Sequence, residues 1–186
     1  MATLITVATS WEVYPFLKKR FKNHLPGDYP IELGNGRFLI VTGMGKKNVK
    51  RCLEKITLDF SQIINIGVAG SLDSSLPIGK IYRVDKICSQ GKIIKFKPYL
   101  NSFLSSLELA EMETHNLPFL WAPKKKARRL VDMEGASLAE CYPDLPHAFI
   151  KIVFDYCSLT SLITSLILHR AIAQKSLIKA FEGIMR

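Results

Sequence analysis

Residues 63–79, IINIGVAGSLDSSLPIG, decide the fold expected for this chain. Ile63, Ile64 and Ile66 form a short β-branched run, which is typical of a strand buried on both faces. The sequence Gly-Val-Ala-Gly at 67–70 follows at the carboxyl end of that strand, where open α/β sheets bind ligands. Glycines there indicate either a plain tight turn or a backbone that approaches a ligand without interference from a Cβ atom. This stretch alone leaves both interpretations open.

Strand and helix patterns alternate along the rest of the chain. Apolar residues at helical spacing predict a first helix that Ser10 caps and that carries Glu12 in its first turn. The pattern therefore predicts an α/β fold, a single-domain three-layer α/β/α arrangement with a central mixed sheet that spans residues 1–186. Further strands are expected at 4–9, 31–33, 37–41, 80–88, 92–96, 130–133 and 148–154, further helices at 47–58, 100–114, 135–141 and 158–185, a hairpin turn at 34–36 and a loop at 118–129.

Composition is that of an ordinary soluble globular protein. The chain has 186 residues, of which 48% are hydrophobic and 23% charged. The most apolar run, 159–168, is too short for a membrane-spanning helix and contains hydroxyl side chains. The first three residues lead directly into a strand pattern, so no signal peptide is expected and the predicted location is the cytoplasm.

The net charge of +10 raises the alternative of nucleic-acid binding. The densest basic run is KKKARR at 124–129, but no aromatic residues interleave with it as a single-strand binder requires. A solvated loop is the simpler interpretation, and no nucleic-acid partner is expected.

The cysteines and histidines are too widely spaced for a metal site. Neither C-x-x-C pairs nor His or Cys neighbours at ligand spacing occur, so no metal and no cofactor are expected, no histidine is assigned to catalysis, and the thiols are expected to be free and buried. The cysteines are Cys52, Cys88, Cys141 and Cys157.

Acidic residues follow three of the predicted strands. Glu12 follows the first, Glu134 the strand at 130–133, and Asp155 the last. Each alone has the simple interpretation of a surface ion-pair partner. Because strand ends converge on one cleft, three acids together with a glycine turn favour a functional site.

The chain resembles the superfamily of nucleoside phosphorylases and nucleosidases, which cleave N-glycosidic bonds. The resemblance rests on GMGK at 43–46, NIGVAG at 65–70, LPIGKI at 76–81, VDMEGASLA at 131–139 and Asp155. In that superfamily, phosphorylases carry a glycine-rich phosphate turn after the first strand, whereas hydrolytic nucleosidases carry a glutamate there. A carboxylate repels phosphate and suits the activation of water. Glu12 therefore implies a nucleosidase.

The resemblance also assigns roles to individual residues. Asp155 matches the general acid at the purine N7, and Glu12 matches the base that orients water. Glu134 matches the residue that binds the ribose hydroxyls, with Met133 under the sugar. The acid has to hold a proton near pH 7, which burial beside Phe154 would favour. The remaining expected substrate-binding residues are Val68, Ala69 and Gly70.

Departures from the family pattern bear on the substrate. Phe154 stands where nucleosidases have Ser, and Val68 replaces the serine of Gly-Ser-Ala-Gly. The segment 96–129 is shorter than in methylthioadenosine/S-adenosylhomocysteine nucleosidases. These departures favour hydrolysis of futalosine or 6-amino-6-deoxyfutalosine in menaquinone biosynthesis. The alternatives are methylthioadenosine/S-adenosylhomocysteine cleavage and a non-catalytic, basic nucleic-acid-binding module. Family members pair, and the apolar run 159–168 supports the expectation of a homodimer.

Overall fold

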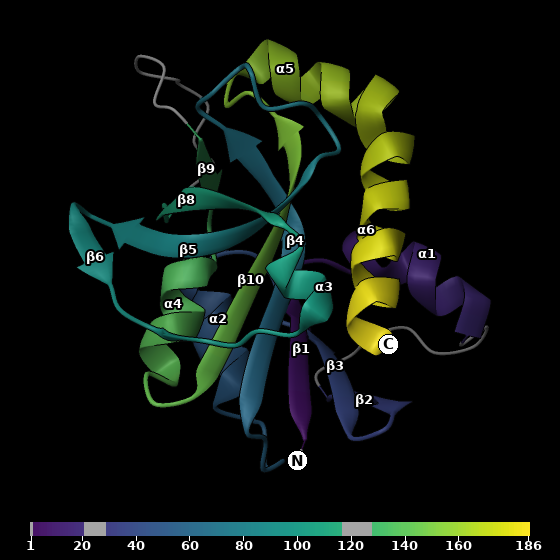
Figure 1. Cartoon of the computed structure of the whole chain (residues 1–186), viewed down its shortest axis with the longest axis vertical. Helices are drawn as coiled ribbons and strands as arrows, with labels where there is room; N and C mark the ends of the chain where they lie inside the picture. The colour runs from purple at the N-terminus through teal and green to yellow at the C-terminus, as the bar shows by residue number, and fades with distance from the viewer. Residues whose placement is uncertain (1, 21–28, 117–127) are drawn as a thin grey trace.

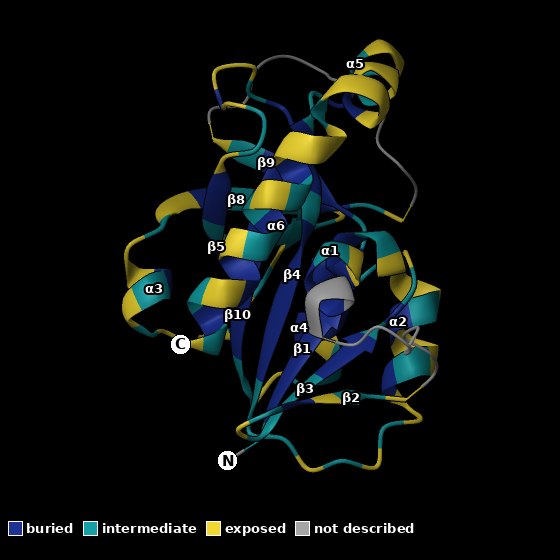
Figure 2. Cartoon of the chain, turned by 90° about the vertical axis from the view of Figure 1, so that its right-hand side faces the viewer, coloured by how far each residue is buried: buried dark blue, intermediate teal, exposed yellow. Residues whose placement is uncertain are grey.

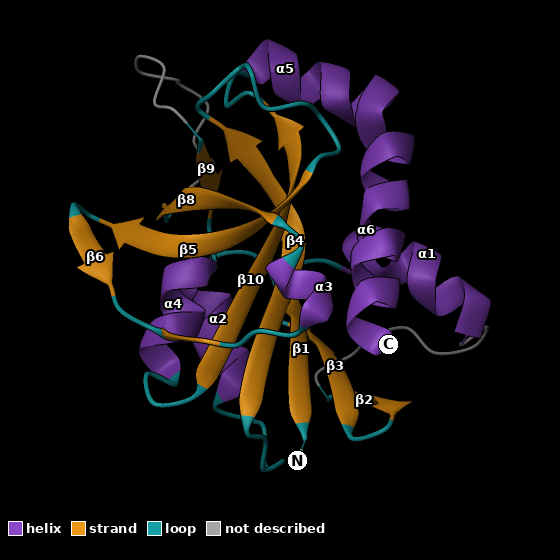
Figure 3. Cartoon of the chain, viewed as in Figure 1, coloured by secondary structure: helices purple, strands orange, loops and turns teal. Residues whose placement is uncertain are grey.

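The computed structural model describes residues 2–20, 29–116 and 128–186, and its sheet contains ten strands among those residues (Figures 1 and 3). Their order is β2-β3-β1-β4-β9-β8-β5-β10-β7, with β6 beside β5 and a further pairing of β4 with β10. The strands are β1 (Thr3–Val7), β2 (Ile31–Gly34), β3 (Arg37–Val41), β4 (Gln62–Ser71), β5 (Ile81–Ser89), β6 (Lys92–Ile94), β7 (Lys97–Pro98), β8 (Glu108–Thr114), β9 (Arg129–Asp132) and β10 (Pro146–Asp155).

Strand β4, which contains the isoleucine run, lies at the centre of the sheet. It pairs in parallel with β1 on one side and β10 on the other, so Ile64 lies between Ile5 and Ala148. These three residues are almost fully buried, as a strand covered on both faces requires. Because β1, β4 and β10 are parallel, their carboxyl ends meet at the same edge of the sheet.

Helices cover both faces of the sheet, which confirms the predicted three-layer α/β fold with a central mixed sheet. One core packs α1 and α6 against Ile5, Ile64 and Ile150, and a second core packs α2 and α4 against Leu4 and Phe149. Figure 2 shows the buried strands between these layers. The helices are α1 (Ser10–Arg20), α2 (Lys46–Leu53), α3 (Ser102–Ser105), α4 (Gly135–Cys141), α5 (Leu159–Thr164), the π-helix η1 (Ser165–His169) and α6 (Arg170–Met185).

The helix expected at 100–114 is wrong. The structure has the short helix α3 there, capped by the Asn101 side chain, followed by strand β8. Residues Ala110, Met112 and Thr114 are buried in alternation, and β8 pairs in parallel with both β5 and β9. Burial of this alternating face in the sheet overrides the helix propensity of its Glu, Leu, Ala and Met residues.

Several smaller expectations also differ from the structure. Helix α2 ends at Leu53 and not near residue 58. Arg129, expected in a loop, begins β9 and forms ion pairs with Glu111 and Glu113, while most of the KKKARR run lies outside the described residues. Of the four free cysteines, expected to be buried, only Cys157 is fully buried. No described helix has the length and apolar character needed to cross a membrane.

Candidate active site

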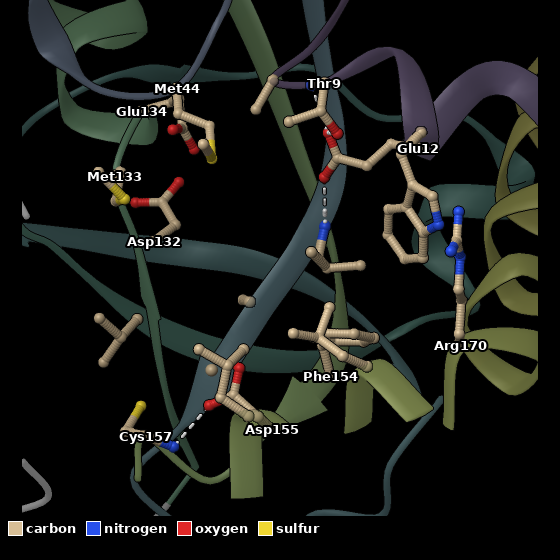
Figure 4. Close-up of a pocket in the computed structure, with 18 residues that line it drawn as sticks. Thr9, Glu12, Met44, Asp132, Met133, Glu134, Phe154, Asp155, Cys157 and Arg170 are labelled. Carbon is tan, nitrogen blue, oxygen red and sulfur yellow. Dashed lines mark hydrogen bonds between the residues drawn. The ribbon is translucent and has the colours of Figure 1, made fainter. Parts of the chain in front are cut away.

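A cavity of about 420 Å³ opens at the carboxyl ends of β1, β4, β9 and β10 (Figure 4). This volume lies within the range of about 300–1,000 Å³ usual for ligand pockets. The structure brings together at this cavity every site residue expected from the sequence: Glu12, Val68, Ala69, Gly70, Met133, Glu134 and Asp155.

Glu12 is held by the start of α1 and by β4. Its Oε2 accepts hydrogen bonds from the Thr9 backbone N–H (2.8 Å) and hydroxyl (3.2 Å), and its Oε1 accepts one from the Val68 N–H (2.8 Å). Ser10 was expected to cap this helix. The bond from the Thr9 N–H to the acid three residues later is instead the arrangement of a capping box with Thr9 at the capping position. Burial raises the pKa of Glu12 despite these donors and nearby Lys151, which makes it a stronger base.

Gly67 and Gly70 of β4 allow acidic side chains to lie close to the backbone. A Cβ atom on Gly67 would lie 2.7 Å from Glu12 Oε1, and one on Gly70 would lie 2.6 Å from Cys157 Sγ and 3.1 Å from Asp155 Oδ1. These separations are shorter than van der Waals contact. The glycines of β4 therefore serve the close approach of site side chains to the backbone.

A buried lysine of the sheet lies near Glu12. Lys151, in the middle of β10, is 1% exposed, and its Nζ lies 2.8 Å from Asp132 Oδ2. Burial opposes its charge, but Asp132 and Glu134 outweigh that effect and raise the pKa of Lys151. Glu12, Asp132, Glu134 and Lys151 are called the inner cluster below.

The other members of the inner cluster are fixed by the loops that follow β3 and β9. Glu134 Oε1 accepts a hydrogen bond from the Gly45 N–H (2.9 Å), and burial together with the charge of Asp132 raises the pKa of Glu134 to about 7. Asp132 also accepts hydrogen bonds from the Gly135 N–H and the Thr114 hydroxyl, which connects α4 to the sheet. Sequence analysis missed Asp132 and Lys151, although a lysine inside the apolar run of β10 is a visible signal.

Asp155 lies at the opposite end of the cavity from Glu12 and Glu134 (Figure 4). Its Oδ1 accepts a hydrogen bond from the Cys157 N–H (2.6 Å). Burial nevertheless raises the pKa of Asp155, as a general acid at neutral pH requires.

The side of the cavity toward the C-terminal helices is largely apolar. The Trp11 ring meets Phe154 edge to face at 5.6 Å, and the guanidinium carbon of Arg170 lies 5.6 Å from the Trp11 ring centroid. Leu162 and Leu166 complete this side. Trp11, Leu162, Leu166 and Arg170 are called the outer wall, and sequence analysis assigned none of them to the substrate site. No three His, Cys, Asp or Glu residues within the described ranges are arranged to hold a metal ion.

Solved structures with the same fold include the following three. A Chlamydia trachomatis structure described as MTAN bound to MTA has a TM-score of 0.81 at 21% identity, over 100% of this chain and 98% of that one. A futalosine hydrolase mutant of Helicobacter pylori gives 0.78 at 16% identity, over 100% and 99%. The D198N mutant of Helicobacter pylori MTAN with 5′-methylthioadenosine in its active site gives 0.77 at 15% identity, over 98% and 97%.

Sequence comparison identifies the family. Comparison with the sequences of curated proteins gives no match. The sequence profile of the Phosphorylase superfamily matches residues 3–103, which is more than half of the chain and includes β1, Glu12 and the glycine turn of β4. This chain belongs to the phosphorylase superfamily.

Proposed function

We propose that the protein hydrolyses the N-glycosidic bond of a purine nucleoside, with futalosine or 6-amino-6-deoxyfutalosine as the preferred substrate. One observation carries the hydrolytic part. The backbone N–H groups of Thr9 and Val68, which could otherwise bind an anion, donate to the Glu12 carboxylate. Phosphate at that place would lose these donors and meet a negative charge, so water is the better nucleophile.

The remaining residues suit the charge changes of the reaction. Cleavage builds positive charge on the sugar and negative charge on the base. Asp155 would protonate the leaving purine, and Glu12 would orient and deprotonate water on the other side of the scissile bond. Glu134, next to Met133, would bind the ribose hydroxyls. The three carboxyl groups of the inner cluster outnumber its one lysine, and their surplus negative charge would stabilise the developing sugar cation.

The choice of substrate rests on the outer wall. Phe154 and Trp11 present aromatic surface, and Leu162 and Leu166 extend it, which suits an arylketone arm on the ribose 5′ carbon. Methylthioadenosine is the second candidate, because this fold carries that ligand in the Helicobacter pylori structure. Because the outer wall suits an arylketone arm, 6-amino-6-deoxyfutalosine is the first compound to test.

A product assay tests the proposal. The protein would be incubated with 6-amino-6-deoxyfutalosine, futalosine, methylthioadenosine, S-adenosylhomocysteine and inosine, with and without phosphate, and the products separated by HPLC. We expect free purine and free sugar without phosphate or metal, most rapidly from the futalosine compounds. A strict requirement for phosphate, with a ribose 1-phosphate product, would contradict the role of Glu12. Higher kcat/KM for methylthioadenosine would favour the second candidate.

We also propose that two copies of the chain pair through α5 and η1. Leu159, Ile163, Ile167 and Leu168 are all about half exposed or more, and Figure 2 shows this exposed stretch at the end of the molecule that carries α5. A second copy would cover this surface and lie beside the cavity. Sedimentation at micromolar concentration should give a dimer, and Ile167→Lys should give a folded monomer of 21.0 kDa. A wild-type monomer would contradict the pairing.

A further inference from the structure

The charges that line the cavity are segregated. The four acids Glu12, Asp132, Glu134 and Asp155 line its interior, and beneath them the buried Lys151 is paired with Asp132. An anionic part of a ligand placed in that interior would be repelled by surplus negative charge. Any such group has to lie elsewhere in the cavity.

Arg170 is the one cationic side chain that lines the cavity among the described residues. It is the first residue of α6, it is exposed, and its guanidinium carbon lies over the Trp11 ring. Within the described part of the chain, no carboxylate lies within ion-pair distance of it, and its guanidinium carbon lies 5.6 Å from the Trp11 ring centroid. Stacking on an indole orients a guanidinium and leaves its N–H edge open to an anion.

The approach to Arg170 is apolar. Leu162, Leu166 and Arg170 follow one another at intervals of four residues, so they occupy one face of the helical segment. In the proposed binding mode, the base lies at Asp155 and the ribose hydroxyls lie at Glu134. The 5′ carbon then points toward the remaining side of the cavity, which is the outer wall. A 5′ arm along the outer wall would therefore meet apolar surface first and a guanidinium at its end.

We propose that Arg170 is a specificity-determining residue that binds a carboxylate at the end of an apolar 5′ arm of the substrate. The inference rests on the proposed nucleosidase function and names the residue that selects the substrate class. The guanidinium and the carboxylate form a charge-assisted hydrogen-bonded pair at the cavity mouth. Since solvent screens this position, we expect about a tenfold preference for the acid over an uncharged analogue.

The test compares two ligands that differ in one charge. kcat/KM is measured for 6-amino-6-deoxyfutalosine and for its methyl ester. Wild-type protein should prefer the acid by about tenfold, chiefly through KM, whereas Arg170→Gln should bring the ratio near one, Arg170→Glu should invert it, and Arg170→Lys should retain part of it. The acid-to-ester ratio within each variant is the readout, because general damage to the site would lower both rates together and leave the ratio unchanged.

Lys175→Gln is the matched control. Lys175 is exposed on the same helix, does not line the cavity, and its replacement removes the same charge. We expect it to leave the acid-to-ester ratio at the wild-type value. Equal ratios in Arg170→Gln and wild type, or equal losses in Arg170→Gln and Lys175→Gln, would overturn the inference.

Failure of the proposed function has a different signature. If wild-type protein hydrolyses neither compound, the proposed reaction is wrong, and calorimetric titration of the same two compounds then decides the role of Arg170. Tighter binding of the acid that Arg170→Gln abolishes would support it. Equal dissociation constants for acid and ester, or no binding of either, would reject it.

Discussion

The inner cluster and the outer wall are built on different parts of the same cavity. The inner cluster is buried, and each of its four members is hydrogen-bonded or ion-paired to a neighbour, from Glu12 with three donors to Lys151 with Asp132. The outer wall comes from α1, α5, η1 and α6, and it includes Leu166 at 55% exposure and the solvent-exposed Arg170. Fixed strand ends can carry chemistry shared by a family, while an exposed helical wall can vary with the substrate.

The π-helix adds to this difference. Residues Ser165–His169 adopt the wide turn between α5 and α6, where the Ser165 hydroxyl lies 3.1 Å from His169 Nδ1. Wide turns of this kind occur at functional sites and shift the side chains that follow. Here the turn immediately precedes Arg170, so it helps to set the direction in which that residue leaves the helix.

The largest expected effect is on the inner cluster. Lys151→Met should lower the free energy of unfolding by about 3–5 kcal/mol, because it leaves the buried Asp132 carboxylate without its ion-pair partner. Urea denaturation followed by circular dichroism measures the loss. A second substitution, Asp132→Asn, should recover part of it by removing the unpaired charge.

Lys86→Met is the control for that prediction. The Lys86 ammonium lies 3.0 Å from Glu111 Oε1, but both side chains are more than a third exposed. We expect a loss below about 1 kcal/mol. Similar losses for the two lysines would mean that the inner cluster does not depend on its buried cation.

Catalysis should depend most on the two acids proposed to transfer protons. Glu12→Gln and Asp155→Asn should each lower kcat by about a hundredfold or more, the usual scale for a positioned acid or base. Steady-state hydrolysis assays measure the change, with exposed Glu32→Gln and Asp144→Asn as controls of unchanged rate. A near-normal kcat in Asp155→Asn would remove the general acid from the proposed mechanism.

Glu134 should make folding stability depend on pH. Its folded pKa of about 7 exceeds the reference value of 4.5, so the stability it contributes is present below pH 4.5 and is lost as the pH rises through 7. The loss amounts to about 3 kcal/mol at most. The raised pKa values of Glu12 and Asp155 make stability depend on pH in the same direction. Their contribution is present both in wild-type protein and in a Glu134→Gln variant.

The comparison with Glu134→Gln isolates that effect. Unfolding free energies measured at pH 5 and pH 7.5 should fall less in Glu134→Gln than in wild-type protein. The same variant should also bind substrate more weakly through the ribose hydroxyls, which would be left poorly paired. Identical pH dependence in the two proteins would contradict the raised pKa.

The sequence predicted the inner part of the cavity better than the outer part. Strand β4 and helix α4 could be read from an apolar run and a small-residue helix, and the acids Glu12 and Glu134 from their places after strands. These features depend on local patterns that the chain carries by itself. Lys151 was also visible as a charge in an apolar strand, but its partner Asp132 is 19 residues away in the sequence and adjacent only in the fold.

The outer wall could not be predicted, because its residues meet only through packing. Trp11 and Arg170 are separated by almost the whole chain, and neither belongs to a motif. The prediction of a helix at the position of β8 was wrong for a related reason. Its two edges pair with β5 and β9, which belong to other parts of the sequence, while its exposed Glu108 and intermediate Glu111 and Glu113 suggested a helix.

The smallest expected effect is the salt dependence of substrate capture. Between about 0.05 and 0.5 M salt, kcat/KM for the acidic substrate should fall about two- to fivefold, because the net charge of +10 and Arg170 both attract an anion and both are screened. The methyl ester should show a flat profile. In Arg170→Gln the slope for the acid should decrease, and whatever remains reports long-range attraction by the rest of the surface. Equal slopes for acid and ester would show that long-range attraction does not contribute to capture, and a kcat/KM for the acid that rises with salt would show that the inner carboxylates dominate the field.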